Sequence, residues 1–153
     1  MTTTATDTKN VLIVGIGGQG VLRCSQVLSD ALVREGLDVK QSEVHGMSQR
    51  GGSVVSEVRF GEKVYSPLSP QAEAHYIVAL EDDEGRRSEH RLPPEGGVMV
   101  DVPEDLREQL FDPRAANMAA LGRLSHYLDV PQDVWHESIR ECMPPKTVEG
   151  NIA

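Results

Sequence analysis

Four closely spaced glycines near the start of the chain could hold an anion. They form the pattern G-x-G-x-x-G and are Gly15, Gly17, Gly18 and Gly20, with Gln19 among them. Glycine adopts positive φ without strain and lets the backbone come close to a ligand, and the exposed N–H groups at the start of a helix attract negative charge. The pattern therefore predicts either a site for phosphate or carboxylate or only a tight corner between a strand and a helix.

A second glycine-rich stretch, at residues 45–52, carries further polar side chains. A hydroxyl, an amide and a guanidinium precede two glycines there: Ser48, Gln49, Arg50, Gly51 and Gly52. Together these groups suit phosphate or carboxylate. Arg50 is the favoured binding residue, with a structural ion pair to Glu43 as the alternative. His45 either donates to a substrate or transfers a proton, or it only caps the end of a strand.

Both stretches are expected at the same edge of a sheet. Residues 11–14 form an apolar run typical of a buried strand, and residues 21–35 repeat apolar side chains at helical spacing before Gly36. Residues 37–44 form the next strand. A right-handed crossover makes two such strands parallel and usually neighbours, so their carboxyl ends point the same way. The two glycine-rich turns should therefore meet at one crevice, where open α/β sheets bind ligands.

The rest of the chain continues the alternation of strands and helices. Residues 53–60 alternate in polarity and are expected to form a β-hairpin with residues 63–65. Further strands are predicted at 76–80 and 98–102, and helices at 103–110, 115–128 and 131–142. The acidic run at 81–84 is interpreted as a solvated surface, and residues from 147 onwards as a trailing end. The prediction is an α/β, Rossmann-like three-layer sandwich with a mostly parallel sheet and an inserted β-hairpin. Residues 1–9 are expected to be a disordered lead-in, and 10–153 a single domain.

The glycine pattern alone does not make a dinucleotide site. Such sites place an acidic residue about 20 positions further on, at the carboxyl end of the second strand. Asp38 comes at the start of that strand, which is the wrong end. Glu43 lies near the correct end, but it runs directly into residues 45–52, which would crowd an adenosine. The sequence therefore argues against NAD.

Bulk properties exclude several classes of protein. The net charge of −9 and the pI near 5.0 disfavour duplex nucleic acid as a partner. No apolar run reaches the roughly 18 residues of a membrane span, and residues 1–9 lack a signal-peptide core, so a cytoplasmic protein is expected. The two cysteines, Cys24 and Cys142, cannot supply four thiolates for an iron–sulfur cluster. Cys24 is expected in the core, and the histidine spacing predicts no metal site.

Two sequence strings go beyond these general patterns. G-I-G-G-Q-G-V-L, followed by S-E-V-H-G-M-S-Q-R-G-G-S-V, resembles the gamma subunit or domain of 2-oxoacid:ferredoxin oxidoreductases. Similarity continues through R-A-A-N-M-A-A-L-G at residues 114–122 and P-K-T-V-E-G-N at 145–151, and it is strongest to the beta subunits of indolepyruvate oxidoreductases. The segment at residues 81–112 is shorter than the corresponding segment of typical family members. The sequence also ends at residue 153, where typical members continue into a further short segment.

The resemblance implies a role inside a larger enzyme. Complexes of this family decarboxylate a 2-oxoacid on thiamine diphosphate, pass electrons through iron–sulfur clusters to ferredoxin, and transfer the acyl group to coenzyme A. This chain has neither the thiamine-binding signature nor cluster cysteines, so both cofactors are expected in a larger partner subunit, and no tightly bound cofactor is expected here. The chain should be inactive alone, without catalytic residues of its own, and should present residues 15–20 and 45–52 near the partner's site.

Two other roles remain open. The chain could be a stand-alone Rossmann-like protein that binds a nucleotide or acyl-CoA at the same crevice. It could instead form a homodimer without a ligand, through the hairpin or the helix that carries Trp135. Trp135 itself is expected to be a core or interface anchor rather than a stacking platform.

Overall fold

The computed structural model of the chain describes residues 8–45, 52–64, 74–93, 97–110 and 115–152. For four of these, Val44, His45, Lys146 and Glu149, it describes the backbone alone. The strands are β1 (Lys9–Ile16), β2 (Asp38–His45), β3 (Ser53–Gly61), β4 (Tyr76–Ala79) and β5 (Val98–Val100). The longer helices are α1 (Val21–Arg34), α2 (Asp82–Ser88), α3 (Glu104–Gln109), α4 (Ala116–Leu124), α5 (Gln132–Cys142) and α6 (Val148–Ile152). Single 3₁₀ turns are η1 (Glu89–Arg91), η3 (Ser125–Tyr127) and η4 (Pro145–Thr147).

The five strands form one twisted sheet in the order β2-β3-β1-β4-β5. β4 is parallel to β1 and β5 is parallel to β4, whereas β3 runs antiparallel to both β1 and β2. Four strands therefore share one direction, with β3 as the exception. The predicted α/β sandwich with a mostly parallel sheet is confirmed.

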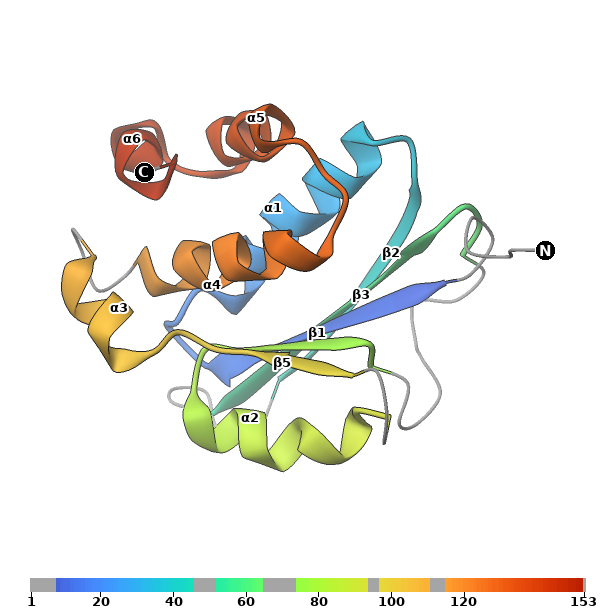
Figure 1. The fold of residues 1–153 in the computed structure, drawn as a ribbon, viewed down its shortest axis with the longest axis vertical. Helices are drawn as coiled ribbons and strands as arrows, with labels where there is room; N and C mark the ends of the chain where they lie inside the picture. The colour runs from blue at the N-terminus through green and yellow to red at the C-terminus, as the bar shows by residue number, and fades with distance from the viewer. Residues whose placement is uncertain (1–7, 46–51, 65–73, 94–96, 111–114, 153) are drawn as a thin grey trace.

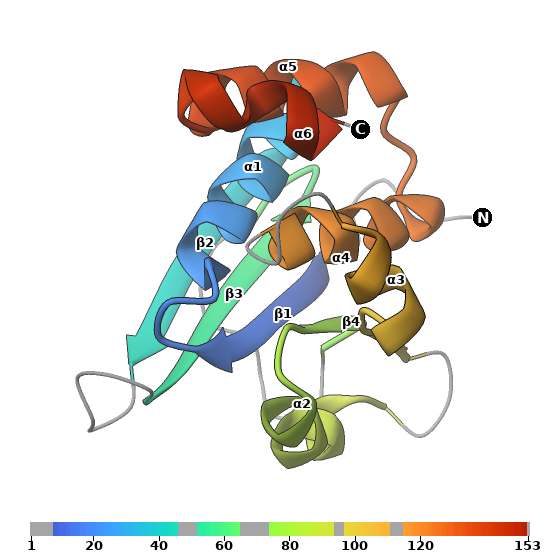
Figure 2. The same ribbon diagram turned by 90° about the vertical axis from the view of Figure 1, so that its left-hand side faces the viewer.

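Helices cover both faces of the sheet (Figures 1 and 2). α1 and α4 pack on one face, and α2 packs on the other beside β1 and β4. α5 lies on the outer side of α1, and α6 packs against α5, so these two helices form an outer layer. α2 comes very close to the sheet because it contains glycine, since a Cβ on Gly85 would lie 2.7 Å from the Cβ of Ala79.

The core has two parts, one on each face of the sheet. Alternating residues of β1 point to opposite faces, so Val11 and Ile13 join the larger cluster under α1, whereas Leu12 and Val14 join the smaller cluster on the α2 side. α1 is long enough to bury one full stripe, which comprises Val21, Cys24, Val27, Leu28, Ala31 and Leu32. Trp135 of α5 belongs to the larger cluster and is only 7% exposed, as expected for a core anchor.

Two predicted neighbour relations are wrong. β1 and β2 are parallel, but β3 lies between them. The antiparallel hairpin is formed by β2 and β3, rather than by residues 53–60 and 63–65. Both edges of β3 are occupied, by β1 and β2, and the Val64 N–H is held by the Asp38 carboxylate at 2.8 Å. The segment after Gly61 therefore cannot return along β3.

Three other local predictions need correction. Residues 82–88 form helix α2, so the acidic run leads into a helix. Asp82 and Asp83 are exposed, as interpreted, whereas Glu84 is only 7% exposed and pairs with Arg87. The last residues do not trail off, since η4 and α6 occupy them. β1 already begins at Lys9, which was assigned to the lead-in, while residues 1–7 lie outside the described part. No described helix is long and apolar enough to cross a bilayer.

Candidate functional site

The two glycine-rich turns meet at one end of the sheet. β1 turns into α1 at the same end at which β2 finishes and β3 begins (Figure 2). The Gly17 N–H donates a hydrogen bond to the Gly52 carbonyl oxygen at 3.0 Å. The predicted meeting is therefore confirmed for these two residues. They touch because β3 is the neighbour of β1, with Ile16 opposite Ser53 in the register.

A hollow of about 490 Å³ opens between the turns, and we call it the turn hollow. It is lined by Ile16, Gly17, Gly18, Gly20, Val21, Leu22, Arg23, Gly52, Ser53 and Val54. Its size falls within the usual range for small-molecule sites. Apolar side chains from β1, α1 and β3 form its walls, and backbone groups of both turns form its rim.

The amino end of α1 faces this hollow without a side-chain cap. Gly20 is the N-cap residue, with φ of 82°, and no side chain makes a capping hydrogen bond there. The first turn of α1 also contains no acidic residue. The first N–H groups of a helix have no partner inside the helix and carry partial positive charge. This arrangement suits a phosphate or carboxylate group in the turn hollow.

Gln19 braces the glycine turn from inside. Its Oε1 accepts a hydrogen bond from the Ile16 N–H at 2.8 Å, and its Nε2 donates to the Leu80 carbonyl at 3.2 Å and to the Glu81 carboxylate at 3.3 Å. The side chain thereby ties the turn to the end of β4. Gln19 was predicted to contact a ligand; the structure shows that its amide holds the turn in shape, and the ligand contact remains a prediction.

Asn117 of α4 braces the same turn from the other side and was missed by sequence reasoning. Its Nδ2 donates to the Gly20 carbonyl at 3.2 Å, and its Oδ1 accepts from the Met118 N–H at 2.8 Å. The residue is 4% exposed. A Cβ on Gly20 would lie only 2.5 Å from Asn117 Nδ2, so this close contact requires glycine. Asn117 lies in the segment 114–122, which is similar to the oxidoreductase family. Nothing in the sequence around it indicated a contact with the glycine turn.

Arg23 is a second residue that sequence reasoning missed. It lies in the first turn of α1 and is the cation among the described residues that line the turn hollow. One of its Nη groups donates to the Cys142 carbonyl at the end of α5, at 2.6 Å. The helical spacing of apolar residues at 21–35 indicated only that Arg23 faces away from the core. A guanidinium has five N–H donors, so one bond to a carbonyl leaves others for an anion.

Several predicted site residues cannot be placed. Ser48, Gln49, Arg50 and Gly51 lie outside the described residues. His45 ends β2, and only its backbone is described. Its predicted roles and that of Arg50 remain predictions. Gly15 is the penultimate residue of β1, where a Cβ would press against the Gln19 amide oxygen at 2.8 Å.

The acidic residues of β2 lie where the sequence indicated. Asp38 starts the strand, at the end of the sheet opposite the turns, and its hydrogen bond from the Val64 N–H lowers the pKa of its carboxyl. Glu43 lies near the carboxyl end and is exposed, and its carboxylate accepts a hydrogen bond from Gln41 Nε2 at 3.4 Å. Gln41 in turn contacts Ser25 and Ser29 of α1.

Neither cysteine belongs to a metal-binding group formed by the described residues. Cys24 is fully buried under the sheet, and burial raises the pKa of its thiol to about 12. Cys142 at the end of α5 is half-buried, and both thiols are free. Within the described residues, no three side chains of histidine, cysteine, aspartate or glutamate converge on a point where they could hold a metal ion.

Comparison with known sequences gives a family match over almost the whole chain. The sequence profile of the pyruvate ferredoxin/flavodoxin oxidoreductase family matches residues 10–153. Among individual proteins, the indolepyruvate oxidoreductase subunit IorB of Thermococcus kodakarensis is 32% identical, and the alignment covers 94% of this chain and 90% of that protein. The alignment spans 182 positions, more than the 153 residues of this chain, so that subunit contains residues without a counterpart here.

Solved structures share the fold at low sequence identity. The gamma subunit of the keto/oxoacid ferredoxin oxidoreductase from Geobacter sulfurreducens matches with a TM-score of 0.74 at 19% identity, covering 94% of this chain and 92% of that one. The 2-oxoglutarate:ferredoxin oxidoreductase of Magnetococcus marinus, solved with 2-oxoglutarate, coenzyme A and succinyl-CoA bound, matches with a TM-score of 0.80 at 18% identity. This chain corresponds to 29% of that longer chain and is itself covered over 95% of its length.

Proposed function

Because the chain belongs to the pyruvate ferredoxin/flavodoxin oxidoreductase family, we propose that it is the small subunit of an indolepyruvate-type 2-oxoacid:ferredoxin oxidoreductase. The complete enzyme would oxidatively decarboxylate a 2-oxoacid, pass the electrons to ferredoxin and release an acyl-CoA. The sequence match to an indolepyruvate oxidoreductase subunit, which covers 94% of the chain, is the observation that carries this proposal.

The chain's own groups are suited to positioning rather than to bond making. Thiamine diphosphate in the larger subunit would supply the chemistry that stabilises negative charge on decarboxylation. This chain would complete the assembly with the rim of the turn hollow. Gln19 and Asn117 hold that rim in one shape, so that its N–H groups need little reorganisation when an anion arrives.

Coenzyme A is the anionic co-substrate that this rim would fit. Its phosphates match the uncapped N–H groups at the start of α1 and the nearby guanidinium of Arg23. Its uncharged arm matches the apolar walls formed by Ile16, Val21 and Val54. Iron–sulfur clusters belong in the partner subunit on this proposal, because two cysteines cannot provide a four-thiolate set.

Reconstitution tests the assignment directly. The chain and its large partner, each purified alone and then combined, are assayed for ferredoxin or viologen reduction with indolepyruvate, pyruvate and 2-oxoglutarate in the presence of coenzyme A. Turnover is expected from the combination alone, with the highest kcat/KM for indolepyruvate. Equal turnover by the large subunit without this chain would refute the proposed role.

A pair of arginine variants tests the predicted binding role of Arg50. Arg50→Ala is expected to lower the kcat/KM for coenzyme A roughly tenfold, because a charge-assisted contact is lost. Arg86→Ala serves as the matched control, since Arg86 lies on α2, far along the chain from either turn, and pairs with Asp83 at 2.7 Å on the surface. Unchanged kinetics of Arg50→Ala would remove this residue from the site.

The turn hollow also fits a stand-alone nucleotide- or acyl-CoA-binding protein, because an uncapped helix start and apolar walls need no partner to bind such a ligand. Titration calorimetry on the chain alone separates the two roles. Weak binding or none to NAD, FAD and acetyl-CoA is expected if the partner completes the site. Tight binding of any of these without a partner would favour the stand-alone role, and light scattering on the same sample would detect a homodimer.

A further inference from the structure

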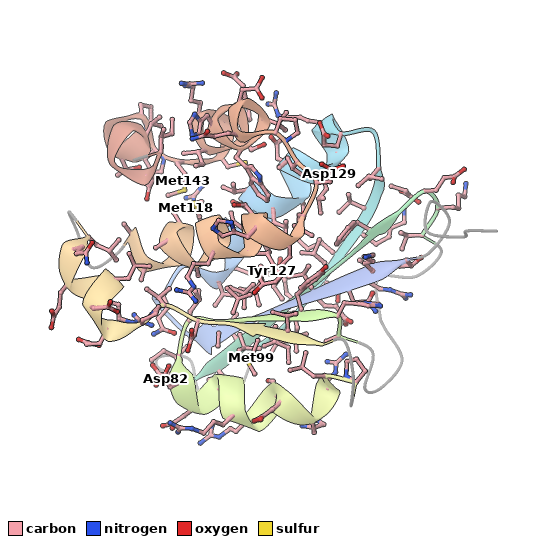
Figure 3. All side chains as sticks on the ribbon, viewed as in Figure 1. Asp82, Met99, Met118, Tyr127, Asp129 and Met143 are labelled. Atoms are coloured by element: carbon pink, nitrogen blue, oxygen red, sulfur yellow. The ribbon has the colours of Figure 1, made fainter. Side chains whose placement is uncertain are left out.

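A second cavity, distinct from the turn hollow, lies between α4 and the outer layer. We call it the helical cavity. It has a volume of about 300 Å³ and shares no lining residue with the turn hollow. α4, α5 and α6 bound it, and Val130 closes it where the chain passes from η3 to α5. Figure 3 shows Met118 of α4 in the space between α4 and this outer layer.

The inner wall of the helical cavity is apolar. Met118 and Leu121 come from α4, and Trp135 and Ile139 come from α5. All four are at most 7% exposed. Ile152 of α6 adds a further apolar surface on the outer side. A wall of this kind favours a flat or branched hydrocarbon group about the size of one aromatic ring.

The rim of the helical cavity is polar and nearly uncharged. Ser125 donates its hydroxyl hydrogen to the Gly122 carbonyl, so its oxygen can accept. Asn151 donates its Nδ2 to the Thr147 carbonyl at 3.0 Å, and its amide oxygen can accept as well. Gln132 offers both a donor and an acceptor. Among the described residues that line the cavity there is no aspartate, glutamate, lysine or arginine, and His136 is the titratable group.

Trp135 gives an independent sign that this region is incomplete. Its indole nitrogen is buried, and it has no hydrogen-bond partner in the part of the chain that the structure describes. Buried indole N–H groups normally find a partner. A ligand acceptor beside the ring, in a cavity that the ring itself lines, would provide one.

We propose that the helical cavity binds a compact, uncharged molecule that combines an apolar ring with an amide-like group. The ring packs against Met118, Leu121 and Ile139. The amide N–H groups donate to acceptors on the rim, and the carbonyl accepts from Gln132 or the Trp135 indole. This site is separate from the proposed oxidoreductase function and does not depend on it.

The chain's single tryptophan reports on this site directly. The full-length chain is titrated with 2-phenylacetamide while Trp135 fluorescence is followed, with phenylacetate as the charged analogue of nearly equal shape. A saturable change is expected with the amide, at a Kd of roughly 1 mM or tighter for so small a ligand. Phenylacetate is expected to bind at least tenfold more weakly, because the described lining residues include no lysine or arginine to pair with its carboxylate.

Gly122 offers a position from which a new side chain could enter the cavity. It lies in helix α4 and lines the cavity, and a Cβ built there meets no atom within 4 Å. Gly122→Phe is therefore expected to leave the thermal midpoint unchanged or higher, while it weakens 2-phenylacetamide binding at least tenfold. Gly122→Ala is the matched control and is expected to bind within about twofold of the unmodified chain.

Three results would overturn the proposal. One is a linear, non-saturable fluorescence response to 2-phenylacetamide. Another is equal affinity for phenylacetate, which would contradict the uncharged character of the site. The third is full binding by a folded Gly122→Phe variant, which would place the ligand elsewhere on the chain.

Discussion

Replacing Gly20 by alanine should damage the fold more than replacing Gly18, although both glycines have positive φ. Gly20 has φ of 82° and Gly18 has φ of 92°. Each alanine would carry a backbone strain of about 1–2 kcal/mol. Only at Gly20 does the new Cβ meet another group, at 2.5 Å from Asn117 Nδ2, whereas nothing lies within 4 Å at Gly18.

The difference between the two variants can be worked out from that contact. Asn117 must move away from the new methyl group and give up its hydrogen bond to the Gly20 carbonyl, which is worth about 0.5–1.5 kcal/mol. Gly20→Ala should therefore cost about 2.5 kcal/mol in total, against about 1.5 kcal/mol for Gly18→Ala. For a chain of this length, about 2.5 kcal/mol lowers the thermal midpoint by roughly 5–10 °C.

Urea unfolding followed by Trp135 fluorescence measures both values. Adding Asn117→Ala to each background completes a double-mutant cycle. Asn117→Ala should cost less in the Gly20→Ala background than in the unmodified chain, because its hydrogen bond is already lost there. Equal unfolding free energies for Gly20→Ala and Gly18→Ala, or strictly additive effects of Asn117→Ala, would refute the idea that Asn117 fixes the glycine turn.

Three further predictions concern single side chains. Gln19→Ala should lower the unfolding free energy by about 1–2 kcal/mol, measured in urea, because its internal hydrogen bonds are lost; an unchanged midpoint would show that the turn keeps its shape without them. In native protein at pH 8, iodoacetamide should leave Cys24 unmodified, because burial raises the pKa of that thiol to about 12. Cys142 should react slowly. The intact mass should show at most one adduct in native protein and two adducts in urea. The pKa of Asp38 is lowered by the Val64 N–H, so its ionised form stabilises the fold at neutral pH, and this contribution is lost as the pH falls through that lowered pKa. The stability gap between the unmodified chain and Asp38→Ala should therefore be widest near pH 7 and close in acid; a gap that widens in acid would contradict the assigned contact.

Local structure followed from the sequence where one pattern dominated. The apolar run at 11–14 lies in β1, and the helical repeat that ends at Gly36 matches α1, with Gly36 at φ of 83°. Most of β1 and one face of α1 are buried, so the spacing of apolar residues was enough to identify the strand and the helix. The resemblance of the two glycine-rich strings to the oxidoreductase family was confirmed by the family match over residues 10–153.

The order of the strands could not be deduced in the same way. Alternating polarity at 53–60 shows that the segment is a strand, but not which strands it pairs with. The turn signal at Gly61 favoured a return along β3, whereas β3 in fact fills the space between β1 and β2. α2 could have been found, because Asp82, Asp83 and Glu84 are acidic residues in a first helical turn, where the helix dipole favours them.

The meeting of the two glycine-rich turns was easier to predict than the residues that support them. The turns were predicted to meet at one edge of the sheet, and the Gly17 N–H does bond the Gly52 carbonyl. Gln19 and Asn117 act through partners 61 and 97 residues away, and no local pattern encodes contacts of that range. Arg23 was overlooked because a lone arginine on a helix is ordinarily a solvated surface residue.

The placement of β3 also bears on the order in which the molecule is built during synthesis. The Gly15–Gly20 segment leaves the ribosome early, yet the strand that flanks β1 on that side arrives only after both α1 and β2 have been made. β2 and β3 are close in sequence and can pair as a nascent unit, whereas docking β3 onto β1 closes a much longer loop and should be slower. A nascent chain released before Ser53 would thus carry the first glycine turn without β3 beside it, and the turn hollow, which Ser53 and Val54 help to line, would not yet exist.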